Sequence, residues 1–173
     1  VFSSSTWYNF ETTVTNEDGT TKTEWVNGQI GQLLCVHEDG TYDDILKSDD
    51  GTWKWLYTYS DADPIAFDGI GNMYYLVSES SGSSTTNMIY CYDPKTETSK
   101  QLTSAVSGTY YQQFQVSTDG KLIFAEGYRW SSSSSTHFLR AIPVANPGSF
   151  NNIFYSSGSS DYLYGWIYDD IRE

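Results

Sequence analysis

The stretch FQVSTDGKLIF, residues 114–124, decides the fold, because two short apolar runs flank a Ser-Thr-Asp-Gly-Lys turn. Turn residues between two such runs predict an antiparallel β-hairpin. Its second half, GKLIFA at residues 120–125, has two earlier copies that share one glycine, one polar residue and four apolar residues: GQLLCV at 31–36 and GNMYYL at 71–76. The chain therefore contains a repeat with a period of about 40 to 50 residues.

Each copy predicts a unit of four strands. The first strand precedes the glycine, at residues 25–26, 65–67 and 114–116, and the run after the glycine supplies the second. A polar loop then leads to two more exposed strands, at residues 43–47 and 52–59 in the first unit, 87–92 and 98–102 in the second, and 138–142 and 152–155 in the third. Four-stranded antiparallel units at this period are typical of the blades of a β-propeller.

The composition supports an all-β fold and excludes several classes of function. The 173 residues include 15 Tyr, 8 Phe and 6 Trp, which favour strands. Lys and Arg number 9 against 22 Asp and Glu, and the resulting formal net charge of −13 excludes a nucleic-acid partner. No apolar run reaches the roughly 18 to 20 residues that a membrane-spanning helix needs.

Two stretches resemble a known family of repeats. The sequence at residues 114–124 is similar to the F-S-x-D-G-K-x-I-x-F strand-turn-strand motif of TolB-like (WD40-like, PD40) propeller repeats. The sequence YDPKTET at residues 92–98 resembles the outer turn of such blades and of kelch-like or quinoprotein-like ones. The first two copies depart from the motif, because QIG at 29–31 and GIG at 69–71 replace the aspartate turn. The resemblance implies a β-propeller.

The repeat predicts one domain over residues 1–173, with blades at 24–60, 61–104 and 108–157. A fourth opening at residues 164–172 aligns on the third copy. In one interpretation the last blade is shared by residues 160–173 and 1–23, which closes the ring and removes open sheet edges. In the other, the chain is a piece of a larger propeller that another chain or domain completes.

The cysteines and histidines predict no metal or cofactor site. Cys35 and Cys91 lie in apolar runs outside any CxxC motif, and we expect buried free thiols, with a single disulfide as the alternative. His37 and His137 have no partner at the spacing of a zinc site or a catalytic triad. Turn carboxylates such as Asp39 predict hairpin turns rather than calcium ligands, because no calcium-loop spacing is present.

Aromatic residues supply the main candidate site. By the alignment of the blades, Tyr110, Arg129, Trp130 and Tyr162 fall in loops or strand ends on one rim of the propeller. An arginine flanked by aromatic residues suits a sugar or a peptide, through stacking, cation–π contacts and bidentate hydrogen bonds. We therefore expect a carbohydrate or protein ligand at this rim.

The leading hypothesis is a non-enzymatic binding or scaffold module. The acidic, lysine-poor surface favours an extracellular, cell-surface or periplasmic location, and the sequence contains no nucleophile, base or metal constellation. The alternative is the propeller part of an enzyme that cleaves a polysaccharide or peptide with rim carboxylates. Asp61 and Asp63, in the loop before the second blade, are the candidates, since glycoside hydrolysis needs two facing carboxylates. A third possibility is a blade segment with no ligand of its own.

Overall fold

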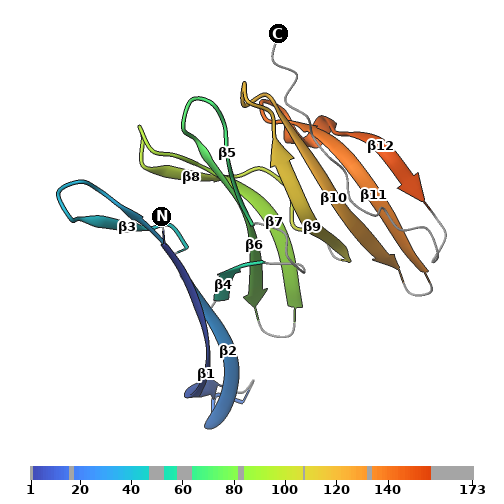
Figure 1. The fold of residues 1–173 in the computed structure, drawn as a ribbon. Coiled ribbons are helices and arrows are strands. Elements are labelled where there is room, and N and C mark those ends of the chain that lie inside the picture. Colours follow the sequence, from blue (N-terminus) through green and yellow to red (C-terminus); the bar gives the residue numbers. More distant parts are fainter. Residues whose placement is uncertain are drawn as a thin grey trace.

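The computed structural model describes residues 2–15, 18–46, 53–57, 64–81, 84–106, 108–131 and 134–156. Within these ranges the chain forms three antiparallel sheets that follow one another in chain order (Figure 1). The described residues contain no α-helix, only a short 3-10 turn at Pro147–Ser149 (η1). No described helix is long and apolar enough to cross a membrane.

The first sheet has the order β1 (Phe2–Thr15), β2 (Thr21–Val36), β3 (Tyr42–Asp44). The predicted hairpin between residues 25–26 and 31–36 is wrong, because β2 runs through this region as one strand. β1 pairs with β2 along its whole length, from Phe2 opposite Leu34 to Thr15 opposite Thr21. The chain reverses instead at residues 18–20, where Gly19 has a φ of 80° and the Asp18 side chain accepts the backbone N–H of Thr20.

This pairing places the N-terminal strand in the first sheet. The predicted sharing of a last blade between residues 1–23 and 160–173 depends on residues 157–173, which lie outside the described residues. That prediction, and with it the choice between a closed ring and a larger propeller, stays a prediction.

The second sheet comprises β4 (Trp53–Leu56), β5 (Ile65–Phe67), β6 (Met73–Ser81), β7 (Ser84–Asp93) and β8 (Thr98–Gln101). β4 and β5 both pair with β6, so they lie along the same edge of that strand. The sequence pattern predicted β4 as the fourth strand of the first unit. It pairs in the second sheet instead, because β6 extends to Ser81 and offers a longer edge than β5 covers.

The third sheet runs β9 (Thr109–Val116), β10 (Leu122–Ser131), β11 (Ser134–Pro143), β12 (Asn151–Ser156), each strand antiparallel to the next. The predicted hairpins at residues 65–76 and 114–125 are confirmed, as are the outer strands of the second and third units. Both units are four-stranded in the predicted order, apart from the division of the innermost strand of the second sheet into β4 and β5.

The middle sheet is buried on both faces. Met73, Tyr75 and Val77 pack with Leu33 of the first sheet and with Leu46, just after β3, in one apolar cluster. The alternate residues of the same strand face the third sheet, in a second cluster that includes Tyr74, Leu76, Phe114, Ile123 and Phe138. Burial on both faces explains why β6 begins with a continuous apolar run rather than an alternating one.

Candidate functional site

A groove of about 310 Å³ lies between the outer parts of the second and third sheets. The chain after β8 forms one wall with Leu102, Ser104 and Val106, and the third sheet and its 3-10 turn form the other. This second wall contains Tyr111, Arg129, Arg140, Pro147 and Phe150. A volume of this size falls within the range of small-molecule binding sites.

Arg140 is held in the groove by aromatic rings. Its guanidinium carbon lies 3.8 Å from the centroid of the Phe138 ring and 4.1 Å from that of Phe150. Nη1 donates to the Tyr111 hydroxyl at 3.2 Å, and Nε donates to Asn152 Oδ1 at 3.3 Å. Stacking and neutral acceptors fix the plane of the guanidinium, and none of its partners among the described residues is a carboxylate.

Arg129 lines the same groove from β10 and is exposed to solvent. Arg140 lies opposite Ala125, and Arg129 follows Ala125 four residues along β10 on the same face. The two backbone positions are therefore about 13 Å apart along the strand direction and one strand spacing, about 5 Å, apart across it. Within the described ranges, neither arginine forms an ion pair with a carboxylate. The groove thus presents two guanidinium groups along an extended path.

The two other described residues of the predicted rim site, Tyr110 and Trp130, lie on the other face of the third sheet. Trp130 is 59% exposed and, as the neighbour of Arg129 in a strand, points to the opposite face of the sheet. Tyr110 stacks on Tyr128, with ring centroids 5.2 Å apart, on that same opposite face. The structure therefore separates Arg129 from the two aromatic residues with which the sequence grouped it. Asp61, Asp63 and Tyr162 lie outside the described residues.

The turn carboxylates that the structure describes bond to their own turns. Asp39 accepts the backbone N–H of Thr41 at 2.9 Å, and Asp93 accepts that of Lys95 at 2.8 Å. Asp119 accepts hydrogen bonds from the Lys121 backbone and the Ser117 hydroxyl and forms an ion pair with the Lys121 side chain. These contacts, the Lys121 side chain foremost, lower the pKa of Asp119 to about 2. The predicted role of such aspartates as turn residues is confirmed at these positions.

Both cysteines that the sequence singled out are free thiols, so the expectation of unpaired cysteines is confirmed and the disulfide alternative is wrong. Each is half-buried rather than fully buried. Burial raises the pKa of the Cys91 thiol, which sits in the core-facing strand β7.

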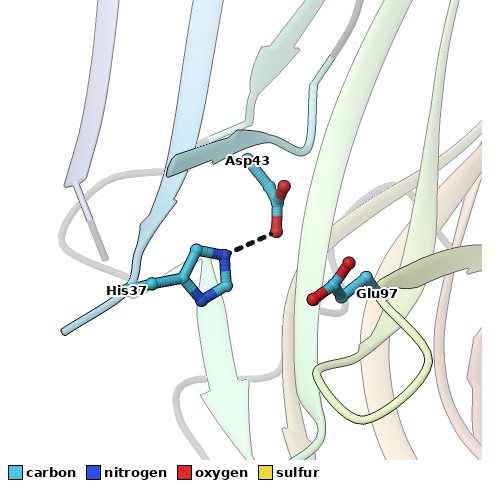
Figure 2. A group of neighbouring side chains, drawn as sticks. All are labelled: His37, Asp43 and Glu97. Atoms are coloured by element: carbon cyan, nitrogen blue, oxygen red, sulfur yellow. Dashed lines mark hydrogen bonds and ion pairs between the residues drawn. The ribbon is translucent and has the colours of Figure 1, made fainter. Parts of the chain in front are cut away.

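A second constellation lies between the first and second sheets, and sequence spacing alone did not reveal it. His37 follows β2, Asp43 lies in β3, and Glu97 lies in the turn between β7 and β8. Figure 2 shows the three side chains converging from these elements. One nitrogen or oxygen atom of each lies within 4.8 Å of the others. The His37 Nε2 to Asp43 Oδ2 distance is 2.9 Å, and this hydrogen bond raises the pKa of His37.

The local backbone explains how these groups meet. A tight turn with Gly40 at a φ of 85° returns the chain after His37, so that Asp43 lies opposite Cys35 in the neighbouring strand. On the other sheet, Glu97 has a φ of 54°, which ends the turn that begins at Asp93. The Tyr92 hydroxyl donates to Asp43 Oδ2 at 3.2 Å and thereby links the two sheets.

Taken together, the described residues define an all-β protein whose antiparallel sheets of three, five and four strands stack in chain order, as the blades of a β-propeller do. No protein-family model and no curated protein matches the chain. A crystal structure of TolB from Acinetobacter baumannii matches it with a TM-score of 0.43 and 15% sequence identity. The alignment covers 83% of this chain and 37% of the TolB chain, so this chain spans little more than a third of that protein.

Proposed function

We propose that the protein is a binding module, located outside the cytoplasm, that holds an extended carboxylate-bearing carbohydrate in the groove between its second and third sheets. The observation that carries the proposal is the pair of arginines in that groove. In a chain with a formal net charge of −13, a described arginine has many possible acidic partners, yet Arg129 and Arg140 form no ion pair among the described residues.

The chemistry of the groove matches such a ligand. An arginine guanidinium binds a carboxylate through two parallel hydrogen bonds, and its planar fork is the preferred partner for this group. Arg140 is already oriented by Phe138, Phe150 and Tyr111, so binding costs it little conformational entropy. Two arginines on one face, whose backbone positions are about 13 Å apart along the strand, suit carboxylates on separate sugar units of an oligosaccharide.

The PD40-like motif at residues 114–124 and the stacked sheets support a propeller blade as the scaffold of this site. The extracytoplasmic location rests on the acidic, lysine-poor composition. The alternative function remains an enzyme that uses Asp61 and Asp63, for which the described residues contribute no observation.

The test compares the wild-type chain with Arg129→Ala in binding to an oligogalacturonate and to a neutral oligosaccharide of equal length. We expect binding of the carboxylated sugar alone, weakened about tenfold by Arg129→Ala, as the loss of one charge-assisted hydrogen-bonded pair implies. Lys121→Ala is the matched control, because it removes one exposed positive charge outside the groove. If Arg129→Ala and Lys121→Ala weaken binding equally, the weakening comes from the change in net charge, and the proposed site is rejected.

The same samples distinguish the alternative functions. Shortened products after incubation would favour a carbohydrate-cleaving enzyme, and their loss on Asp61→Asn would assign the reaction to that carboxylate. Binding of an acidic peptide, with no binding of either sugar, would indicate a protein ligand instead.

A further inference from the structure

The constellation of His37, Asp43 and Glu97 has the composition of a transition-metal site. It offers one imidazole nitrogen and two carboxylate oxygens, all within 4.8 Å of one another. Zinc is bound by such groups at about 2.0 to 2.2 Å, so ligands of a single ion lie about 3 to 4 Å apart. His37 Nε2 and Asp43 Oδ2, at 2.9 Å, are already close enough. Glu97 is exposed and needs to move by only about 1 Å to complete the set.

The balance of charge at this place also favours a cation. The Asp43 and Glu97 carboxylates each place an oxygen within 4.8 Å of the other, so two negative charges lie close together at this place. No described lysine or arginine forms an ion pair with Asp43 or Glu97. A divalent cation would neutralise both carboxylates and would lie between the His37 nitrogen and the Asp43 oxygen in place of their direct hydrogen bond.

The surroundings provide an outer layer of support and room for further ligands. The Tyr92 hydroxyl holds Asp43 through Oδ2, as outer hydrogen-bond partners hold metal ligands in known sites. A cavity of about 490 Å³, lined in part by Asp43, Glu97, Tyr92 and Ser99, opens beside the carboxylates. Water molecules in this cavity can fill the coordination positions that the three side chains leave open.

We propose that His37, Asp43 and Glu97 bind one divalent transition-metal ion, with zinc preferred over calcium, and that the ion fastens the first sheet to the second (Figure 2). The imidazole ligand sets the preference, because calcium takes six to eight oxygen ligands and little nitrogen. The fastening follows from the positions of the ligands. His37 and Asp43 belong to the first sheet and its turn, whereas Glu97 belongs to the second.

The experiment is isothermal titration of the untagged full chain with zinc sulfate and, separately, with calcium chloride. We expect one zinc ion per chain and no saturable calcium binding. Glu97→Gln and His37→Gln should each weaken zinc binding about tenfold or more, as expected for the loss of a ligand. Glu38→Gln is the matched control, since Glu38 is exposed and adjacent to His37 but outside the cluster. It should bind zinc as the wild type does.

A second variant and a second measurement distinguish the loss of a zinc ligand from a failure to fold. Glu97→Gly removes the ligand and suits the positive φ at this position, so the turn itself should be retained. At about 100 times the zinc dissociation constant, the melting temperature of the wild type should rise by about 5 °C or more, and that of Glu97→Gly should not. Absence of saturable binding at about 1 mM zinc, or equal affinity in wild type, His37→Gln and Glu97→Gly, would overturn the proposal.

Discussion

Asn87 closes a pair of hydrogen bonds on the backbone of Tyr111: its Nδ2 donates to the Tyr111 carbonyl at 2.7 Å, and its Oδ1 accepts the Tyr111 N–H at 2.7 Å. β9, which contains Tyr111, is the edge strand of the third sheet. The outward backbone groups of an edge strand need a partner from outside the sheet. The Asn87 side chain, on β7 of the second sheet, provides it and so sets the register of one sheet against the next.

Replacement of Asn87 by Ala should destabilise the protein by about 2–4 kcal/mol. Asn87 is only 2% exposed, so its removal leaves a buried N–H and a buried carbonyl without partners. Urea unfolding followed by tryptophan fluorescence measures the change. Asn151→Ala, at an exposed position in β12, should stay within about 0.5 kcal/mol of wild type. Similar losses of unfolding free energy in the two variants would show that the hydrogen bonds from Asn87 to Tyr111 do not stabilise the protein.

A matched pair of glycines tests the contact between the β9–β10 turn of the third sheet and Asp68, which follows β5 of the second. Gly120 has a φ of 68°, and a Cβ built there would lie 2.6 Å from Asp68 Oδ2. Asp68 is buried and accepts hydrogen bonds from Asn72 and Tyr74, so it has little freedom to move away. Gly71 has a φ of 95° with open space around it.

Gly71→Ala should therefore cost about 1 kcal/mol, from backbone strain alone. Gly120→Ala should cost about 1–2 kcal/mol more, because the new methyl group displaces Asp68. Thermal unfolding of both variants and the wild type measures the difference. If the two substitutions cost the same, the packing of Gly120 on Asp68 is not a source of stability.

The third repeat could be predicted from the sequence because its signals are local. The Ser-Thr-Asp-Gly-Lys turn and the apolar runs beside it specify β9 and β10 without reference to any other part of the chain. The course of β2 could not be predicted in this way. Asn27 and Gly28 have the residue types of a turn, yet their pairing with Asn9 and Tyr8 of β1 keeps them extended.

In the two candidate sites, too, local features could be predicted from the sequence and long-range contacts could not. The opposite directions of Arg129 and Trp130 follow from the two-residue period of a strand, so the sequence contained this information once β10 was recognised. The meeting of Asp43 with Glu97 did not lie in any local pattern. It arises because the β7–β8 turn reaches the first sheet, a contact between residues far apart in the chain.

Three tyrosines of the middle sheet, the buried Tyr74 and Tyr75 and the half-buried Tyr90, should make the free energy of unfolding depend on alkaline pH. Burial raises the pKa of Tyr75 to about 12, and desolvation likewise raises the pKa of Tyr74 and Tyr90. In the unfolded chain these groups ionise near pH 10. The folded state therefore binds their protons more tightly, so its stability is fully present below pH 10 and falls as the pH rises towards 12.

Urea midpoints measured in steps from pH 9 to pH 11.5 should stay constant at first and then decline. Absorbance at 295 nm should show these tyrosines ionising only as the protein unfolds. Tyr75→Phe removes one such group and should make the decline shallower. A titration in which every tyrosine ionises near pH 10 without unfolding would contradict the expected burial of these hydroxyls.

Arg129 and Trp130 test which face of the third sheet binds ligand. Both are exposed neighbours in β10, so neither substitution should disturb the core, and they point to opposite faces. If the groove of Arg129 and Arg140 is the site, Arg129→Ala weakens binding of an oligogalacturonate about tenfold and Trp130→Ala changes it less than about twofold. Fluorescence anisotropy with a labelled oligosaccharide gives both affinities. The reverse pattern would move the site to the opposite face, beside Tyr110 and Tyr128, and would favour stacking on a neutral sugar over recognition of its carboxylates.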